Sequence, residues 1–378
     1  MSERIAVALS GGVDSAVAAL LLIEAGHQVE GLHMSNWDDD DGDYCTAAAD
    51  YNDARAVADE LKIPLHRVSF AAEYRSRVFQ YFLSEYAAGR TPNPDVLCNR
   101  EVKFGVCLDY AQRLGVTRLA TGHYARLTPD GLLLRGADPD KDQSYFLHQV
   151  DAPRLKKAVF PVGGLLKSEV RRRAREAGIP VHAKRDSTGI CFIGERPFRD
   201  FLARYLPARP GTIETEDGDV VGRHAGLMYY TLGQRQGLGL GGRAGHPEAA
   251  WFVAEKDLDR NVLIVVQGRS HPALYSRAVV TAPPHWIGPA PRLPLECTVK
   301  LRYRQRDVAV AVAGLSESGL ALELTEAAFA VTPGQYAVFY HGERCLGGAV
   351  ITEALPVTNT VVRSRRQVSA VADAPRPV

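Results

Sequence analysis

The stretch Ala8-Leu9-Ser10-Gly11-Gly12-Val13-Asp14-Ser15 decides the fold at the start of the chain. It closes an apolar run, 4–9, that predicts a strand, and it opens an Ala- and Leu-rich run, 15–25, that predicts a helix ending near Gly26. Two adjacent glycines permit a tight turn and let a ligand approach the backbone. Free N–H groups at the start of the helix, aided by the helix dipole, attract an anion. The stretch therefore predicts a phosphate-binding loop, with a plain strand–helix turn as the alternative.

Three side chains of this loop add to the prediction. Ser10 and Ser15 supply hydroxyl donors, and Asp14 is placed where a carboxylate could hold a Mg²⁺ ion bound to phosphates. No lysine follows the glycines, so the loop differs from the Walker pattern.

The first 125 residues alternate between strand-like and helix-like segments. Further strands are predicted over 28–34, 65–70 and 118–121, and further helices over 46–61, 72–88 and 102–114. Strands that alternate with helices of this length form parallel sheets, and helices on both faces make such a sheet doubly wound. We expect an α/β domain over 1–205.

The pattern changes after about residue 205, where Pro207, Pro210 and Gly211 interrupt the chain. A small central domain is predicted over 206–275. Short strands then predict a barrel-like β domain over 276–356. Its predicted strands are 297–304, 307–312, 321–324, 336–340 and 345–351. The segment 357–378 predicts a loose tail.

Composition restricts the class of protein. Among 378 residues, 46% are hydrophobic and 24% are charged, which is typical of globular chains. The longest apolar run, 16–23, is too short to span a bilayer, and the amino terminus lacks a signal-peptide pattern. We therefore expect a cytoplasmic protein without a membrane partner. None of the six cysteines forms a Cys-x-x-Cys pair, so we expect no protein metal site and no permanently bound cofactor.

Charge is distributed unevenly along the chain. Residues 1–60 contain 2 basic and 13 acidic residues, whereas residues 154–185 contain 10 basic and 2 acidic residues. We call the second segment the basic band. It suits a polyanionic partner, and a solvated helix face is the alternative.

Two cysteines stand in segments that predict loops. Cys98 ends the stretch Asn93-Pro94-Asp95-Val96-Leu97-Cys98 between two predicted helices, with Lys103 close behind. A nearby cation and a helix start both favour thiolate, and Asp95 is a candidate acid or base. Cys191 lies between Gly189 and Gly194, with Lys184 and Arg185 upstream. For both cysteines the alternative is that the side chain is simply a small hydrophobic group buried in the core. We favour this interpretation for Cys107, Cys297 and Cys345.

Several longer blocks resemble bacterial tRNA-specific 2-thiouridylases, members of the PP-loop ATP pyrophosphatase superfamily. The resemblance runs over about residues 4–355. The blocks that carry it are SGGVDS (10–15), TAAADYNDA (46–54), FAAEY (70–74), GRTPNPDVLCNREVKF (89–104), ATGHYAR (120–126), KDQSYFL (141–147), DSTGICFIGER (186–196), TLGQRQGLGLGG (231–242), VKLRYRQ (299–305), TPGQYAVFY (332–340) and CLGGAVI (345–351).

The resemblance implies an activity. The family adenylates O2 of the wobble uridine in the tRNAs for lysine, glutamate and glutamine, using ATP with Mg²⁺, and then replaces that oxygen by sulfur. Cys191 corresponds to the persulfide cysteine, which is loaded by a sulfur carrier protein or a cysteine desulfurase. Cys98 corresponds to its partner nucleophile, and a disulfide between the two is then reduced. Asp95 corresponds to the acid or base beside the uridine.

The resemblance also implies binding residues. ATP contacts are expected from Ala8, Leu9, Ser10, Gly11, Gly12, Val13, Asp14, Ser15, Met34 and Gly122; target-base contacts from Asn93, Pro94 and Asp95; and tRNA contacts from His123, Lys141, Asp142, Gln143, Arg302, Tyr303 and Gln335. Ordinary core roles are the alternative for Met34 and His123. Independently, Lys300, Arg302, Arg304 and Arg306 alternate along a predicted strand and would form a cationic row on one face.

Ala16 departs from the family pattern, which has a serine there, and the tail beyond residue 355 matches nothing. Three alternatives remain: a PP-loop ligase that adenylates a small metabolite, a non-catalytic RNA-binding protein, and a thiolase acting at another tRNA position. The cationic row and the two loop cysteines argue against the ligase. The phosphate loop with Asp14, together with both cysteines, argues against the non-catalytic RNA-binding protein, and the blocks PNPDVLC and STGICF argue against the other thiolase.

Overall fold

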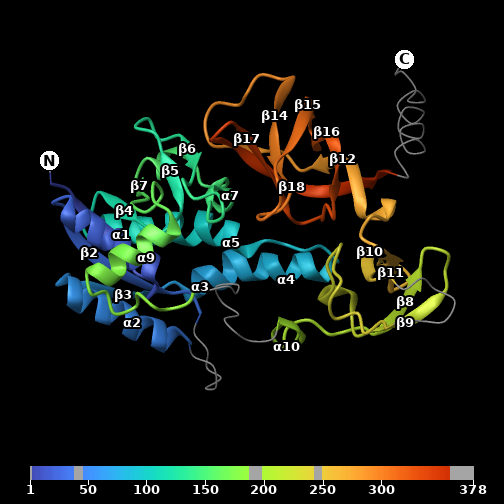
Figure 1. The fold of residues 1–378 in the computed structure, drawn as a ribbon, viewed down its shortest axis with the longest axis horizontal. Helices are drawn as coiled ribbons and strands as arrows, with labels where there is room; N and C mark the ends of the chain where they lie inside the picture. The colour runs from blue at the N-terminus through green and yellow to red at the C-terminus, as the bar shows by residue number, and fades with distance from the viewer. Residues whose placement is uncertain (1, 38–45, 187–197, 242–248, 358–378) are drawn as a thin grey trace, which may run out of the picture.

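The computed structural model describes residues 2–37, 46–186, 198–241 and 249–357 (Figure 1). It consists of an amino-terminal α/β domain, a central β domain and a carboxy-terminal β-barrel. Helix α4 (Gln80–Ala87) extends from the α/β domain toward the central domain and passes beneath the barrel in the view of Figure 1.

The α/β domain is built on a five-stranded parallel sheet with the order β3-β2-β1-β4-β7. Its strands are β1 (Arg4–Ala8), β2 (Gln28–Ser35), β3 (Leu65–Ser69), β4 (Arg118–Ala120) and β7 (Ala158–Val159). Its helices are α1 (Val13–Glu24), α2 (Thr46–Leu61), α3 (Ala71–Tyr74), η1 (Arg75–Phe79), α4, α5 (Pro94–Leu97), η2 (Cys98–Cys107), α6 (Leu108–Arg113), α7 (Ser144–Leu147), α8 (Ala152–Leu155) and α9 (Lys167–Glu176). The predicted doubly wound parallel sheet is confirmed.

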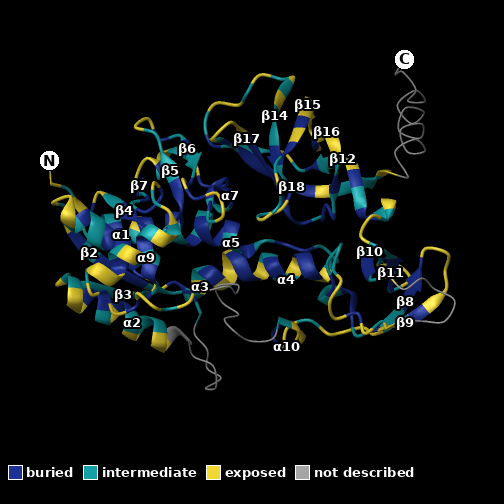
Figure 2. Ribbon diagram, in the orientation of Figure 1, coloured by how far each residue is buried: buried dark blue, intermediate teal, exposed yellow. Residues whose placement is uncertain are grey.

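Strand β1 explains why this sheet has helices on both faces. Its residues alternate between two cores: Ile5 and Val7 face α1, α2 and α9, while Ala6 and Ala8 face the layer of α4, η2 and α6. All four side chains are buried, as is typical of a central parallel strand. Figure 2 shows buried residues in dark blue within the α/β domain and exposed residues in yellow along α2 on its outside.

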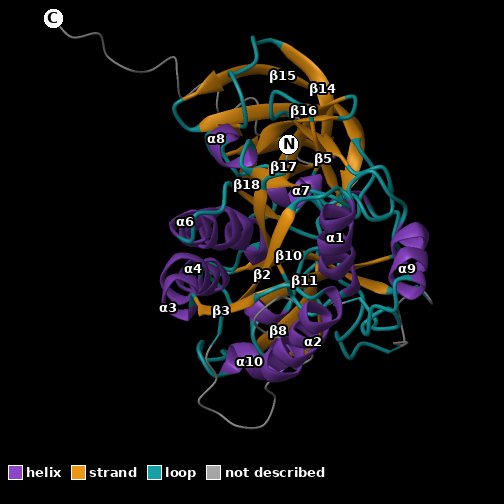
Figure 3. Cartoon of the chain, turned by 90° about the vertical axis from the view of Figure 1, so that its left-hand side faces the viewer, coloured by secondary structure: helices purple, strands orange, loops and turns teal. Residues whose placement is uncertain are grey.

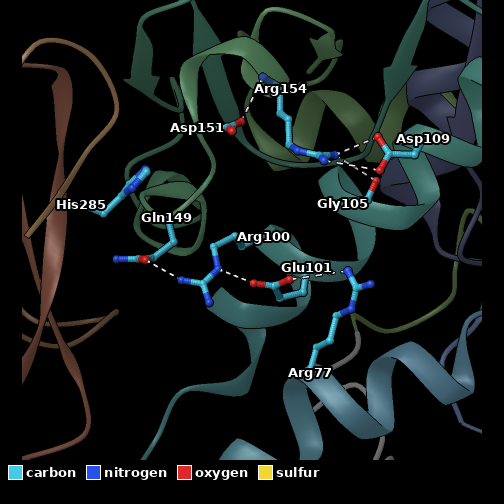
Figure 4. Close-up of a pocket in the computed structure, with 9 residues that line it drawn as sticks. All are labelled: Arg77, Arg100, Glu101, Gly105, Asp109, Gln149, Asp151, Arg154 and His285. Carbon is cyan, nitrogen blue, oxygen red and sulfur yellow. Dashed lines mark hydrogen bonds and ion pairs between the residues drawn. The ribbon is translucent and has the colours of Figure 1, made fainter.

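The helices predicted over 72–88 and 102–114 exist, but each contains a π-helical segment. In η2 the backbone breaks at Gly105, with φ −92° and ψ −113°. The guanidinium of Arg154 donates to the carbonyl oxygens of Phe104 at 2.6 Å and Gly105 at 3.1 Å, and so satisfies the acceptors that the break exposes. Figure 4 shows the contact with Gly105.

A polar cavity of about 240 Å³ lies beside this break and reaches His285 of the barrel (Figure 4). Its charges are largely paired, because Arg154 contacts Asp109 and Arg100 contacts Glu101. We interpret the cavity as a polar gap between the α/β domain and the barrel.

Six antiparallel strands close the carboxy-terminal barrel in the order β12-β16-β15-β14-β17-β18, with β18 pairing back to β12. They are β12 (Tyr275–Thr281), β14 (Leu295–Lys300), β15 (Val308–Ser316), β16 (Gly319–Phe329), β17 (Tyr336–His341) and β18 (Arg344–Pro356), with β13 (His285–Trp286) paired outside this order. The predicted β-barrel is confirmed, and its interior is filled by branched and aromatic side chains such as Val299, Val310 and Phe339.

One prediction within the barrel is wrong. Strand β14 ends at Lys300, so Arg302, Arg304 and Arg306 do not form a cationic row on a strand face. The chain turns instead, with the Gln305 amide donating to the Arg302 carbonyl at 3.0 Å. Leu301 is buried at the start of this turn and fixes its place on the barrel.

The α/β domain and the barrel share a sheet. A hairpin of the α/β domain, β5 (Ala125–Leu127) and β6 (Leu133–Arg135), pairs with β18. Next to it, the Tyr145 hydroxyl donates to the Tyr336 carbonyl at 3.1 Å, and the Arg135 guanidinium lies 3.6 Å from the centre of the Tyr340 ring. The contact between the two domains is therefore hydrogen-bonded as well as apolar.

The central domain is a four-stranded sheet with the order β10-β11-β8-β9 and a small core of its own. Figure 3 labels its strands β8, β10 and β11. Its strands are β8 (Gly211–Thr215), β9 (Val220–His224), β10 (Trp251–Asp257) and β11 (Val262–Gln267); α10 (Phe198–Ala203) precedes them, and η3 (Leu227–Tyr229) and η4 (Pro272–Leu274) are short 3₁₀ turns. Lys256 joins this domain to the end of α4, where its ammonium donates to the Gly89 carbonyl at 3.0 Å. Within the described residues, no helix has the length and apolarity needed to cross a bilayer.

The half-buried Lys256 gives a pH-dependent prediction. Burial lowers the pKa of Lys256 from 10.5 to about 8, so between these values the unfolded chain binds more protons and stability rises with pH. Relative to Lys256→Met, we expect the wild type to gain up to about 3 kcal/mol of unfolding free energy between pH 8 and pH 10.5. Urea unfolding followed by tryptophan fluorescence measures this difference. Lys156→Met, at an exposed position, is the control variant. A difference between the wild type and Lys256→Met that stays constant across the window would contradict the prediction.

Candidate functional site

The loop between β1 and α1 has the geometry that its glycines predict. Gly11 has a φ of +78°, a conformation that side chains disfavour. Gly12 is the N-cap of α1 and supplies no side-chain cap, so the first amides of this helix face outward for a ligand. The Ser15 hydroxyl accepts from the Ser10 amide at 3.3 Å and donates to the Gly12 carbonyl at 3.0 Å. The loop is thus ordered by its own hydroxyl groups.

Neighbouring backbone segments enclose the loop tightly. A Cβ atom on Gly122, which follows β4, would lie 2.7 Å from the Asp14 carbonyl carbon and from the Ser15 amide nitrogen. A Cβ atom on Gly11 would lie 2.4 Å from the Asp50 carbonyl oxygen of α2. The Lys184 ammonium then joins loop and helix, donating to Gly11 O at 3.2 Å and to the carboxylates of Asp50 at 2.8 Å and Asp53 at 2.6 Å.

A cluster of charges lies over the first turn of α1. The Lys167 ammonium contacts both carboxylate oxygens of Asp14, at 2.7 and 2.8 Å, and one oxygen of Asp186 at 2.8 Å. The Tyr124 hydroxyl donates to Asp14 at 2.7 Å, and Lys141 donates to Asp186 at 2.7 Å. Burial alone would raise the pKa of Asp186, but hydrogen bonds from Lys141 and Lys167 outweigh it and lower the pKa to about 2.

Sequence reasoning missed Lys167, Lys184 and Tyr124 as parts of this site. Both lysines belong to the basic band, which was expected to face a polyanion. Most of the band's cations form ion pairs with carboxylates of this chain: Arg154 with Asp109, Lys167 with Asp14 and Asp186, Arg171 with Asp186, Arg172 with Glu169 and Glu176, Arg173 with Glu169 and Glu24, and Lys184 with Asp50 and Asp53. No local signal in the sequence shows this pairing.

The structure corrects the predicted setting of Cys98. Cys98 is not in an exposed loop but begins η2, where it is 1% exposed. The Asn36 amide, just beyond the end of β2, lies 3.9 Å from its sulfur. Cys98 therefore lies at the edge of the sheet where the carboxyl ends of the strands, and the phosphate loop, also lie. The core role expected for Cys107 agrees with its burial, which raises the pKa of that thiol to about 12.

Asn93, Pro94 and Asp95 form the beginning of the same helical run. Asn93 is the N-cap of α5, Pro94 is its first residue, and both Asn93 and Asp95 are half-buried. Asp95 and Cys98 are three positions apart in continuous helical backbone, so they share one face. Burial raises the pKa of Asp95, and the nearby ammonium of Lys103 opposes part of that rise. Such a carboxyl is suited to proton transfer.

Cys191 lies outside the described residues, but residues on either side of its segment are placed. Asp186 is held at the charge cluster by Lys141, Lys167 and Arg171. Phe198, at the start of α10, packs on Tyr86 of α4 with ring centroids 5.4 Å apart.

The residues expected to contact tRNA differ in exposure. Arg302 is exposed, and Tyr303 packs on Phe146 with ring centroids 4.3 Å apart. Asp142 is buried and accepts from the amides of Gly136 and Ser144 at 3.0 Å. Gln335 is also buried and donates to the Thr91 carbonyl at 2.8 Å.

The other expected contacts lie nearer the phosphate loop. Gln143 accepts from the Tyr124 amide at 3.0 Å, and Met34 is half-buried on β2. His123 is 8% exposed, with its ring nitrogen 2.7 Å from the Thr121 hydroxyl oxygen; burial, with Lys103 nearby, holds its pKa well below the usual range. The nucleotide and tRNA contacts of all these residues remain predictions.

Two observations concern the side chains that could bind a metal ion. No group of three or more His, Cys, Asp or Glu residues that could hold a metal occurs within the ranges that the structure describes. Asp14 supplies hard carboxylate oxygens at the start of α1, which fits a Mg²⁺ ion held mainly by phosphates and water.

Comparison with known proteins covers nearly the whole chain. Three family profiles match in succession: the tRNA methyl transferase HUP domain over residues 3–195, the tRNA methyl transferase PRC-barrel domain over 199–267, and the aminomethyltransferase beta-barrel domain over 276–351. A protein of Marinobacter nauticus described as tRNA-specific 2-thiouridylase MnmA is 58% identical over 367 residues, covering 93% of both chains. The chain belongs to the tRNA-specific 2-thiouridylase family.

Two further members of the tRNA-specific 2-thiouridylase family bear the same description. The protein of Alcanivorax borkumensis is 57% identical over 354 residues, covering 93% of this chain and 97% of its own. That of Alkalilimnicola ehrlichii is 56% identical over 362 residues, covering 94% of this chain and 99% of its own. The three matched domains follow the order of the three domains in the structure.

The close approach of Gly122 to the loop leads to a second prediction. In Gly122→Ala the added Cβ atom meets backbone atoms that cannot rotate away, so the loop must shift and ATP binding should weaken about tenfold or more. Isothermal titration with ATP and Mg²⁺ measures the affinity. Gly164→Ala is the matched control, because nothing lies within 4 Å of a Cβ atom at Gly164. Equal affinities for the two variants would contradict the assignment of the loop.

Proposed function

We propose that this protein catalyses the ATP-dependent 2-thiolation of the wobble uridine in the tRNAs for lysine, glutamate and glutamine. The observation that carries the proposal is the full-length similarity to relatives described as tRNA-specific 2-thiouridylases, combined with a phosphate loop that is intact in this structure. The reaction requires two parts, an activation of O2 and a delivery of sulfur, and the described residues bear on each.

The activation uses the loop between β1 and α1. The amides at the start of α1 and the Ser10 and Ser15 hydroxyls bind phosphate oxygens, while Met34 and Gly122 contact the nucleotide. Uridine O2 attacks the α-phosphorus of ATP, the bond to the bridging oxygen breaks, and pyrophosphate leaves with the electron pair. Bound Mg²⁺ would neutralise phosphate charge here, and Asp14 is the carboxylate that would hold it.

The uridine is held at the start of α5. The wobble base leaves its stack and contacts Asn93 and Pro94, and Asp95 accepts the proton that uridine N3 loses when O2 is adenylated. Burial supports this role, because a carboxyl whose pKa is raised is a stronger base once it is ionised. Adenylation makes O2 part of a good leaving group, AMP.

Sulfur comes from a persulfide on Cys191. Its terminal sulfur attacks C2, AMP departs with O2, and Cys98 thiolate attacks the Cys191 sulfur. The S–S bond breaks, the terminal sulfur stays on C2, Asp95 returns the proton to N3, and a Cys98–Cys191 disulfide forms, which a thiol reductant reopens. Support comes from the helical face that Asp95 and Cys98 share, which brings the general base Asp95 and the Cys98 thiol together.

The partners follow from this chemistry. A sulfur carrier protein or a cysteine desulfurase loads Cys191, and a reducing cytoplasm keeps Cys98 available. Exposed Arg302 and the adjoining turn supply phosphate contacts on the barrel side. The family membership favours tRNA over the small-metabolite ligase as the substrate class.

A sulfur-transfer assay tests the proposal. Protein, tRNA-Glu transcript, ATP, Mg²⁺, cysteine and a cysteine desulfurase are combined, and the digested nucleosides are weighed by mass spectrometry. Cys191→Ala and Cys98→Ala should each abolish 2-thiouridine while leaving ATP binding intact. Cys297→Ala is the control and should retain activity, because this cysteine lies in β14 of the barrel. Thiolation that persists in Cys191→Ala would overturn the mechanism.

Binding of tRNA gives a separate prediction for Arg302. Arg302→Ala should weaken tRNA binding and lower the slope of log affinity against log salt by about 0.7 to 1, as expected for one lost phosphate contact. Filter binding across a series of salt concentrations measures the slope. Arg172→Ala is the control, because Glu169 and Glu176 already neutralise Arg172 on α9. An unchanged slope in Arg302→Ala would remove this residue from the phosphate contacts.

A further inference from the structure

The phosphate loop carries no lysine of its own, yet a lysine lies directly over it. Lys167 is the first residue of α9, far from the loop in sequence, and its side chain is 12% exposed. Its ammonium is 2.7 and 2.8 Å from the two oxygens of Asp14 and 2.8 Å from Asp186. A cation is therefore held over the α1 terminus, where the loop's amides face an anion.

The position of Lys167 is fixed by its surroundings. Its backbone amide donates to the buried Asp138 carboxylate at 2.8 Å, which anchors the first turn of α9. Its ammonium lies 5.7 Å from the centre of the Tyr124 ring, and Tyr124 in turn donates to Asp14. The stem is enclosed and the ammonium is aimed at the loop, so little side-chain entropy remains to be lost when an anion binds.

The contacts of Lys167 with Asp14 are the ones with which a bound nucleotide competes. Lys167 and Tyr124 occupy three of the roughly four lone-pair directions of the Asp14 carboxylate, so a phosphate-bound Mg²⁺ ion would compete with them for these oxygens. A triphosphate brings several negative charges to the α1 terminus, and an ammonium freed from Asp14 finds phosphate oxygens within the same reach. An exchange of partners satisfies both groups.

We propose that Lys167 is a catalytic residue of the adenylation step, and that its ammonium moves from Asp14 to the phosphates held by the loop. This inference rests on the proposed function. When uridine O2 attacks the α-phosphorus and the bond to the bridging oxygen breaks, the electron pair passes to pyrophosphate. Lys167 stabilises the negative charge that develops on this leaving group.

Neighbouring cations do not fit this role equally well. Lys184 directs its three contacts to Gly11 O and to the two carboxylates of α2, which ties the loop to that helix. Arg171 donates to the carbonyl oxygens of His182 and Lys184, so it holds the backbone. Of these three cations, Lys167 is the one in contact with Asp14.

The first test is nucleotide affinity, measured by isothermal titration without tRNA. Lys167→Met should bind ATP with Mg²⁺ at least about tenfold more weakly, as expected for loss of one charge-assisted contact, but bind AMP as the wild type does. AMP lacks the phosphates that Lys167 contacts. Lys157→Met is the control, because Lys157 is exposed and its ammonium contacts Gln112 at 3.2 Å. Loss of ATP and AMP affinity in equal measure, or of neither, would overturn the proposal.

The second test distinguishes a contact of Lys167 with phosphate from a role in which Lys167 only neutralises Asp186. Pyrophosphate release in the presence of tRNA should fall about a hundredfold or more in Lys167→Met, as for other deleted transition-state donors, and be partly restored in Lys167→Arg. If Lys167 serves only to neutralise Asp186, the double variant Lys167→Met with Asp186→Asn will regain the wild-type rate, and the proposal is overturned. A double variant that stays slow supports it.

These readouts also distinguish this inference from the proposed function. If the wild type forms no 2-thiouridine, the proposed function fails. The comparison of ATP with AMP binding still decides whether Lys167 contacts the outer phosphates. Thermal unfolding of each variant verifies that the fold is retained.

Discussion

The site depends on backbone segments that approach the β1–α1 loop more closely than side chains would permit. Residues after β4 and the backbone of α2 contact the loop at Gly122 and Gly11, and both positions lack space for a Cβ atom. These contacts hold the first turn of α1 at the carboxyl edge of the sheet. Every other feature of the site, including the charge cluster and the helix that begins at Cys98, is placed relative to that edge.

The fold brings part of the acidic amino-terminal segment against part of the basic band. Lys167 and Lys184 of the band contact carboxylates at the start of α1 and on α2. Neutralising buried and half-buried charges in this way avoids the cost of leaving them unpaired. Ion pairs at the phosphate loop are also exchangeable, since a nucleotide can replace a carboxylate as the partner of an ammonium.

The sequence was sufficient to predict the parallel sheet, the phosphate loop and the barrel, because apolar periodicity and paired glycines are local signals. It was insufficient wherever a long-range contact decided the outcome. The alternating cations after Lys300 resembled a strand, yet β14 ends at Lys300 and the chain turns there. The position of Cys98 between two predicted helices suggested a loop, but Pro94 is the first residue of a helix, a position that proline favours. The positions of Lys167, Tyr124 and Asp186 depend on tertiary packing that no spacing reveals.

The hairpin that joins β18 has a consequence for how such a chain can vary in length. Leu134 of β6 pairs with Arg344 of β18, so the barrel is held directly against the α/β domain and not only through the polypeptide that connects them. Insertions in the central domain, which lies apart from this junction, would leave the barrel at a constant distance from the phosphate loop. Insertions between β5 and β6 would alter that distance. We therefore expect length variation among relatives to accumulate in the central domain and its connections, and the hairpin to keep its length.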